Sequence, residues 1–285
     1  MTKPICIYHG GCDDGFGAAY AVWKRFGDAW EYYPGVYQAA PPDVTGRDVV
    51  LVDFSYRRAV LEDMIRVANS VLILDHHQSA ELDLIGIEGF GASIGKQVTA
   101  IFSHTESGAM MAWKHFHKSA PPGLIEHIQD RDLWTFKLEG TRDISAGLRA
   151  YPQDFEIWHN FGDNDQLEWL RIEGRAINRW YDNQIKQMQK RLIRMNIAGV
   201  MVNVANAPYA FASDLAGALA VGQPFGAVFY MGPDGVSFSL RSDDEGMDVS
   251  VVAATYGGGG HKHAAGFRVA NLTALNIVDL GDVPQ

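Results

Sequence analysis

The triplet Asp75-His76-His77 directly follows an apolar run at residues 70–74. Such a run is typical of a buried strand, so one carboxylate and two imidazoles would emerge at its carboxyl end. In an open α/β sheet, ligands bind outside the carboxyl ends of the strands. The triplet is therefore a candidate for metal binding or catalysis.

Two further strand-like runs end in the same kinds of residue. Residues 5–8 lead into His9 and then Asp14, and residues 49–52 lead directly into Asp53. Carboxylates and imidazoles suit Mn²⁺, Mg²⁺ and similar ions. Two such ions about 3.5–4 Å apart clamp the oxygens of a phosphoryl transfer, and a strand-end carboxylate such as Asp53 is suited to bridge them. A lone Asp or His would be read as surface solvation, but three strand ends with the same chemistry favour a metal site.

A second candidate site lies in the last quarter of the chain. Four consecutive glycines, residues 257–260, precede His261 and Lys262. Successive glycines allow backbone N–H groups to converge on an anion. The alternative is a flexible connector, but the imidazole and the lysine beside the glycines favour contact with a phosphate or nucleotide. The dehydrogenase-type fingerprint is absent, because the loop leads into an expected strand and not into a helix.

The composition restricts the class of protein. A chain of 285 residues with 47% hydrophobic content can bury a large core, in one large or two ordinary domains. Its formal net charge of −10, without a block rich in Lys and Arg, argues against long duplex nucleic acid and favours short phosphorylated substrates. The sequence shows no membrane-span or signal-peptide pattern, and its two cysteines form no disulfide framework, so we expect a cytoplasmic protein.

The hydrophobic pattern predicts two α/β regions joined by a helix. Up to about residue 165, strands alternate with helices, which predicts an α/β domain with a parallel, doubly wound sheet. Helices are expected at residues 15–26, 57–69, 106–117 and 123–129. Apolar residues at three- and four-residue steps then predict a long amphipathic helix within residues 166–195, which joins the domains. Packing of this helix within the chain is favoured over a coiled-coil dimer seam, and homo-oligomer formation stays open.

Residues 196–285 are expected to form a smaller α+β domain. Runs at residues 200–204, 226–231 and 236–241 are typical of strands, and the turn at residues 231–235 predicts a hairpin between the last two.

The DHH triplet, the upstream Asp53 and the segment from His9 to Asp14-Gly15 together resemble the DHH phosphoesterase superfamily. That superfamily includes RecJ-type exonucleases, NrnA-type oligoribonucleases and phosphatases, and cyclic-dinucleotide phosphodiesterases. The last part of the chain resembles the DHH-associated domain at residues 239–242, 248–250 and 257–267. The resemblance spans most of the chain.

The resemblance implies a metal-dependent phosphoesterase that acts on short single-stranded oligonucleotides or small phosphorylated nucleotides. It implies two divalent ions, with Mn²⁺ favoured and Mg²⁺ as the alternative. The implied metal ligands are His9, Asp14, Asp53 and His76, with a further aspartate after a helix, for which Asp130 fits best and Asp132 competes.

The resemblance also implies roles around the reacting phosphate. Asp53 would hold the attacking water, His77 would contact the scissile phosphate, and Asp75 would orient a neighbouring imidazole. The substrate's terminal phosphate or nucleotide would be bound, in a cleft between the domains, by Arg241, Gly258, Gly259 and His261.

One position departs from the superfamily pattern. Its first motif has two aspartates two residues apart, and here Cys12 stands in place of the first while Asp14 fits the second. Asp13 could substitute if the loop turns, Cys12 could bind a softer metal as a thiolate, or one metal site could be weak. The departure at Cys12 leaves open, as an alternative to an enzyme, a nucleotide-binding regulatory module with a degenerate metal site. The alternative with the same metal chemistry is a pyrophosphatase or polyphosphatase.

Overall fold

The computed structural model describes residues 2–37, 39–162 and 164–274. The chain divides into two compact units, Met1–Asn178 and Arg179–Gln285, and each is described by itself.

The first unit is built on a five-stranded, fully parallel sheet in the order β2-β1-β3-β4-β5. The strands are β1 (Ile5–His9), β2 (Glu31–Gly35), β3 (Asp48–Val52), β4 (Ser70–Asp75) and β5 (Gln97–Phe102). The expected parallel, doubly wound sheet is thus confirmed. Strands β2 and β5 were not expected from the sequence. They form the two edges of the sheet, where exposure on one side removes the need for a continuous apolar run.

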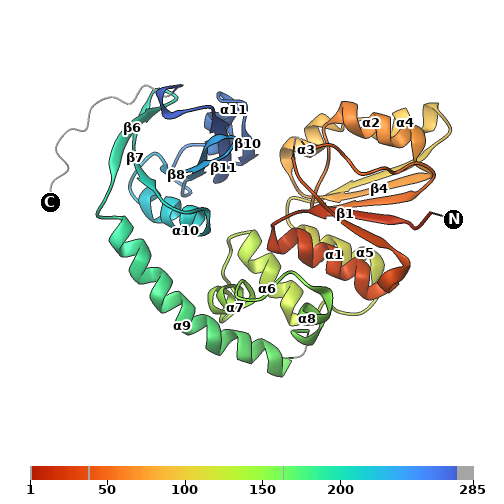
Figure 1. Cartoon of the computed structure of the whole chain (residues 1–285), viewed down its shortest axis with the longest axis horizontal. Helices are drawn as coiled ribbons and strands as arrows, with labels where there is room; N and C mark the ends of the chain where they lie inside the picture. Colours follow the sequence, from red (N-terminus) through yellow and green to blue (C-terminus); the bar gives the residue numbers. More distant parts are fainter. Residues whose placement is uncertain (1, 38, 163, 275–285) are drawn as a thin grey trace. The chain divides into compact units, whose positions relative to one another are not determined.

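Helices cover both faces of this sheet (Figure 1). One face carries α1 (Asp13–Phe26) and α5 (Gly108–Phe116), and the other carries α2 (Arg58–Val67), α3 (Gln78–Asp83) and α4 (Ile87–Ser93). Successive residues of a strand point to opposite faces of the sheet, because the strand is pleated. Cys6 and Val50 lie in the core under α1 and α5, whereas Ile7 and Leu51 lie in the core under α2.

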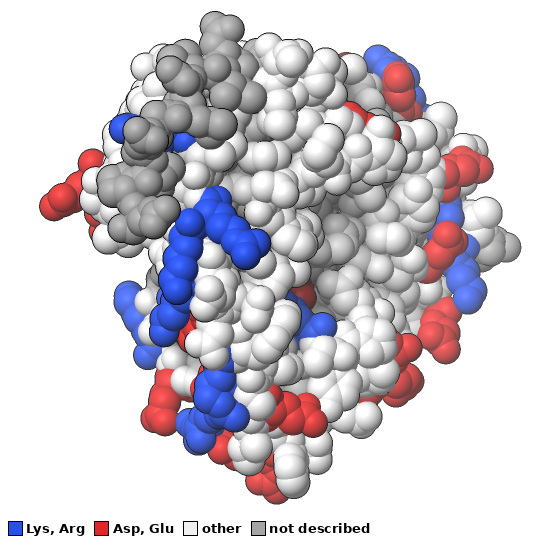
Figure 2. Space-filling model, turned by 60° about the vertical axis from the view of Figure 1, so that its left-hand side comes forward, with Lys and Arg blue, Asp and Glu red and all other residues white. Residues whose placement is uncertain are grey.

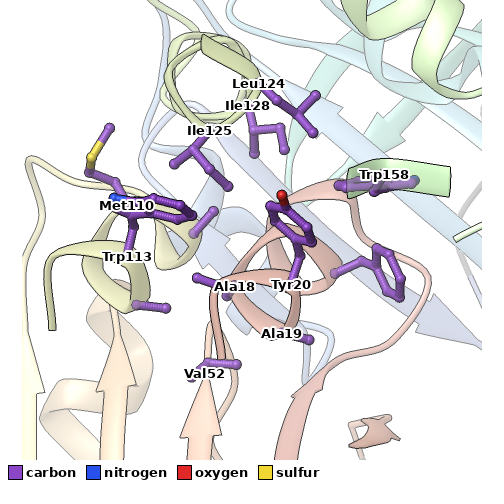
Figure 3. Close-up of a cluster of buried hydrophobic side chains, with 14 of the residues drawn as sticks. Ala18, Ala19, Tyr20, Val52, Met110, Trp113, Leu124, Ile125, Ile128 and Trp158 are labelled. Atoms are coloured by element: carbon purple, nitrogen blue, oxygen red, sulfur yellow. The ribbon is translucent and has the colours of Figure 1, made fainter. Parts of the chain in front are cut away.

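The core beneath α1 extends beyond the sheet to three more helices (Figure 3). These are α6 (Gly123–Asp132), α7 (Thr141–Leu148) and α8 (Phe155–Asn160), and a single-turn η1 (Gly27–Ala29) follows α1. Small side chains at Ala18 and Ala19 allow neighbouring elements to approach α1 closely, while Ile125, Ile128 and Trp158 fill the space around Tyr20. This packing fixes the end of α6 relative to the sheet.

The long helix α9 (Asn164–Met188) begins where the sequence predicts and ends earlier than expected. Residues 193–197 form strand β6 instead of a final helical turn. Met195 and Ile197 are buried and Arg194 is exposed, which is the alternation of a strand. None of the helices in the described residues is long and apolar enough to span a bilayer.

The second unit holds a six-stranded mixed sheet in the order β10-β11-β9-β8-β7-β6, in which only β7 and β8 run parallel. Its strands are β6 (Ile193–Ile197), β7 (Val200–Asn206), β8 (Gly226–Gly232), β9 (Gly235–Arg241), β10 (Gly259–His261) and β11 (Ala264–Val269). Helix α10 (Tyr209–Ala220) packs on β7, β8 and β9, and α11 (Val249–Ala254) packs on β9, β10 and β11. The short η2 (Leu272–Ala274) ends the described chain. The expected hairpin is confirmed, since Gly232 pairs with Gly235.

Candidate metal centre

Three strand ends of the parallel sheet converge where the strand order reverses. Strands β1 and β3 are neighbours, and the crevice outside such a switch point is where doubly wound sheets bind ligands. His9 ends β1, Asp53 follows β3 and His76 follows β4. Asp53 Oδ1 lies 3.0 Å from His76 Nε2, and Asp53 Oδ2 lies 3.5 Å from His9 Nδ1. The structure therefore brings together the strand-end residues that the sequence singles out.

Two sets of ligand atoms meet at Asp53. His9, Asp53 and His77 form one set, and Asp14, Asp53 and His76 form the other, with the ligand atoms of each set within 4.8 Å of one another. Asp53 is 1% exposed, and neither of its carboxylate oxygens has a hydrogen-bond partner among the described residues. Its oxygens are therefore open to a further ligand such as a cation. The residues present thus fit a divalent cation in each set.

The backbone around Asp53 is held in an uncommon conformation. Asp53 has a φ of +54°, in the left-handed region that side chains other than glycine rarely adopt. Its N–H donates to Leu74 O at 2.9 Å. The first residue of α5 lies against it, and a Cβ on Gly108 would be 2.3 Å from the Cβ of Asp53. Glycine at position 108 is therefore required for α5 to begin beside the carboxylate.

Asp14 connects the centre to the start of α5. Its carboxylate accepts hydrogen bonds from Gly108 N at 2.6 Å and Ala109 N at 3.0 Å, at the positive end of the helix. Burial and the neighbouring carboxylates of Asp53 and Asp132 raise the pKa of Asp14 well above its usual range. Acidic groups crowded in this way are relieved by a bound cation.

The pKa values of Asp53 and His76 are shifted by the other charged groups of the centre. Burial alone would raise the pKa of Asp53, but His76 and His9 hold it well below its usual range. Burial lowers the pKa of His76, but Asp53, Asp132 and Asp14 outweigh it and raise the value to about 10. The carboxylates thus stabilise positive charge at the position of His76 Nε2, and metal binding would release that proton.

The first residue of the triplet orients the third. Asp75 is fully buried, and its Oδ1 lies 2.7 Å from His77 Nδ1 and accepts hydrogen bonds from the backbone N–H groups of His76 and His77. Ser55 donates its hydroxyl to Asp75 Oδ2 at 2.7 Å. These contacts fix the plane of the His77 ring, as expected for a carboxylate that supports an imidazole ligand.

The aspartate at the end of α6 that reaches the centre is Asp132 and not Asp130. Asp132 Oδ2 lies 3.6 Å from His76 Nε2. The Asp130 carboxylate is already satisfied by four donors, which are the hydroxyls of Thr135 and Thr141 and the backbone N–H groups of Lys137 and Leu138. This corrects the expectation that favoured Asp130, whose side chain holds the loop after α6.

The departure at Cys12 is not compensated by Asp13. The Asp13 carboxylate pairs with Arg149 at 3.0 Å and is in neither ligand set. Cys12 is the residue that precedes α1, and burial together with Asp53, Asp132 and Asp14 raises the pKa of its thiol well above the usual range. The surrounding carboxylates therefore disfavour a thiolate at this position.

In the second unit, the glycine-rich segment differs from the expected anion-binding nest. The N–H of Gly258 donates to Ala253 O at 3.0 Å and thereby caps α11, so this amide is already used. This corrects the expectation for Gly258. Gly259 and His261 belong to β10, which pairs with β11. Arg241 ends β9 and donates to Ser213 Oγ at 3.0 Å.

Sequence reasoning did not anticipate Tyr37. This side chain is 47% exposed, and its ring centroid lies 5.1 Å from that of His9 and 6.4 Å from that of His77. Tyr37 follows β2, so recognising that edge strand would have placed it at the same end of the sheet as the triplet.

Comparisons with known proteins agree with this architecture. No family model matches the chain. The uncharacterized protein R106 of Acanthamoeba polyphaga mimivirus is 30% identical to it over 300 residues, which cover 94% of this chain and 68% of the viral protein. The chain belongs to the R106 family.

Two solved structures show the fold of this R106-family chain. RecJ from Thermus thermophilus, in complex with Mn²⁺, has a TM-score of 0.51 at 14% identity, covering 94% of this chain and 49% of RecJ. PggH from Vibrio cholerae, a pGpG-specific phosphodiesterase, has a TM-score of 0.50 at 13% identity, covering 94% of both chains. The fold expected from the sequence is thereby confirmed.

Proposed function

We propose that this protein is a divalent-metal-dependent phosphoesterase that acts on short single-stranded oligonucleotides or small phosphorylated nucleotides. The observation that carries the proposal is Asp53, a buried carboxylate without hydrogen-bond donors among the described residues that belongs to both ligand sets. A carboxylate in that position can bridge two cations, which is the arrangement used for in-line displacement at phosphorus. The two DHH neighbours, one holding Mn²⁺ and one specific for the dinucleotide pGpG, support the same chemistry.

The ligand sets assign the residues that would hold the ions. His9 and Asp53 would bind one ion, and Asp14, Asp53 and His76 the other, with Asp132 beside His76. When bound, two divalent cations lower the pKa of a water and neutralise charge on the phosphoryl oxygens.

Side chains of the protein would orient the attacking water and stabilise the charge that develops on the phosphate. Asp53, at the junction of both sets, would accept a hydrogen bond from the attacking water and orient it toward phosphorus. His77, held by Asp75, would donate to a phosphate oxygen as negative charge develops there, with coordination in the first set as the alternative.

Selection of the substrate is proposed for the second unit. Arg241 ends β9, and the carboxyl-terminal segment that resembles the DHH-associated domain carries Gly259 and His261. Arginine binds phosphate oxygens through a fork of donors. A chain with a net charge of −10 favours short or small ligands over long duplexes.

The test is a substrate panel with protein reconstituted in Mn²⁺ and, separately, in Mg²⁺. The panel contains short labelled RNA, short labelled DNA, 3′,5′-adenosine bisphosphate, pyrophosphate and polyphosphate. Release of nucleoside monophosphates or of phosphate from the nucleotides would support the proposal, and the order in which products shorten would give the polarity. Hydrolysis of polyphosphate alone, or binding of nucleotides without turnover in either metal, would contradict it.

A further inference from the structure

The loop that follows α6 begins at Asp132, beside the metal centre, and carries two large aromatic side chains. They are Trp134 and Phe136, whose ring centroids are 5.0 Å apart at an interplanar angle of 74°. Trp134 is 42% exposed. Because two residues of chain span at most about 7 Å, the backbone of Trp134 lies close to that of Asp132.

Two arginines stack on these rings. The guanidinium carbon of Arg131 lies 4.6 Å from the Trp134 centroid, and that of Arg142 lies 3.8 Å from the Phe136 centroid. Arg142 has no ion-pair partner among the described acidic side chains, so its charge is available to a ligand. We call Arg131, Trp134, Phe136 and Arg142 the aromatic platform. It places two guanidinium groups beside two aromatic rings.

The loop holds the platform in a strained conformation. Trp134 and Phe136 have φ values of +59° and +47°, in a region that bulky side chains rarely adopt. The Asp130 carboxylate fixes the loop through hydrogen bonds from Thr135, Lys137 and other donors. Backbone strain of this kind persists only where the surroundings impose it, and it clusters at functional sites.

We propose that the aromatic platform stacks a nucleobase of a single-stranded oligonucleotide whose reacting phosphate lies at the metal centre. Exposed aromatic side chains combined with arginines are the means by which proteins bind single strands without reading their sequence. Arg142 adds positive charge for a flanking backbone phosphate. The proposal rests on the proposed function and narrows its substrate class to ligands that carry a base, which excludes pyrophosphate and polyphosphate.

The first measurement is binding without divalent cations, so that no hydrolysis occurs. Fluorescence anisotropy compares a labelled single-stranded RNA tetranucleotide with the same backbone lacking its bases. We expect the wild-type protein to bind the tetranucleotide about 10- to 100-fold more tightly than the abasic strand, as base–aromatic stacking predicts. Trp134→Ala should remove this difference, and Trp134→Phe should keep most of it. Arg142→Gln should weaken the binding of both strands equally and reduce the salt dependence.

The matched control is Trp169→Ala on α9. Trp169 is 60% exposed and belongs to the same unit, but it has no arginine stacked on it among the described residues. This variant should bind both strands as the wild-type protein does. Thermal unfolding of each variant shows whether it is folded, and Trp134→Leu serves as the second test if Trp134→Ala is not.

The outcomes separate this inference from the proposed function. The proposal that the aromatic platform stacks a base is contradicted if the wild-type protein binds both strands equally, or binds neither. It is also contradicted if Trp134→Ala and Trp134→Leu keep the preference for the strand with bases. The same comparison of strands by kcat/KM in Mn²⁺ gives a second readout. A preference for bases in binding, together with no turnover of any strand or nucleotide in Mn²⁺ or in Mg²⁺, would support the base contact and contradict the proposed function.

Discussion

At the scale of single residues, the candidate centre depends on one carboxylate whose described surroundings give it no hydrogen-bond donor. Asp53 is buried beside two imidazoles, and its own backbone is in a left-handed conformation. The imidazoles beside it hold the pKa of Asp53 below its usual range, so the carboxylate is ionised. An ionised carboxylate whose oxygens have no hydrogen-bond partner among the described residues can bind a cation, and this makes the proposed role of Asp53 testable.

We expect Asp53→Asn to reduce kcat for hydrolysis by at least about 10³-fold, as for other residues that act at the centre of a catalytic group. The free energy of unfolding of the metal-free protein should fall at pH 7, because the carboxylate that stabilises the protonated His76 imidazole is removed. Steady-state kinetics and urea unfolding measure the two quantities.

The matched control for Asp53→Asn is Asp13→Asn. The Asp13 carboxylate pairs with Arg149 outside both ligand sets, so this variant should keep its activity. A large loss of activity in Asp13→Asn would mean that Asp13 takes the place of the aspartate that Cys12 replaces.

Arg241→Ala tests the proposed division of labour between the units. Loss of a charged hydrogen bond to phosphate should raise KM by about 10- to 100-fold with little change in kcat. Steady-state kinetics with a short oligonucleotide would show this. A fall in kcat at unchanged KM would instead place Arg241 in the reacting step.

At the scale of elements, the end of α6 shows what the sequence could and could not predict. The three strand ends and the helix after residue 123 follow from hydrophobic patterning, so His9, Asp53 and His76 were placed together. The choice between Asp130 and Asp132 was not available from patterning. Residues two apart point about 200° away from each other around a helix, and only the packing of α6 decides which side chain faces the sheet.

The sequence also did not predict which backbone amides form hydrogen bonds at the ends of helices. Four glycines in a row predicted free amides, but the end of α11 takes the N–H of Gly258 as its cap. The edge strands β2 and β5 were missed because they are half exposed, and Tyr37 was missed with β2.

The loop after α6 should be a measurable source of stability. Asp130→Asn removes a charged acceptor from four donors, so we expect a loss of about 2–3 kcal/mol in the free energy of unfolding at pH 7. Chemical denaturation would measure it. Asp154→Asn is the control, because Asp154 caps α8 through one bond to Ile157 N, and asparagine caps a helix equally well. Equal losses in the two variants would contradict a special role for the network around Asp130.

At the scale of the whole molecule, charge and metal binding are linked. On the face in Figure 2, lysine and arginine side chains stand in small groups among acidic and uncharged ones. With a net charge of −10, the chain concentrates part of its acidity at the metal centre, where Asp14, Asp53 and Asp132 crowd around His76. A divalent cation should therefore stabilise the folded state.

We expect saturating Mn²⁺ to raise the midpoint of thermal unfolding of the first unit. At about 100 times the Kd, the gain is about 2.7 kcal/mol, which for a unit of this size corresponds to a shift of roughly 5–10 °C. Differential scanning calorimetry with and without a chelator measures the shift. Asp53→Asn should abolish it, and a shift of equal size in that variant would mean that Mn²⁺ stabilises the protein elsewhere.

The close approach of α5 to Asp53 also limits which sequences can carry this centre. Any residue other than glycine at position 108 would push a methyl-sized group into the carboxylate's own carbon atoms. In a saturation library scored for retained hydrolysis, this position should tolerate no alternative, although it is not itself a ligand. Evolution could therefore exchange ligands around the centre more easily than it could exchange this one small neighbour.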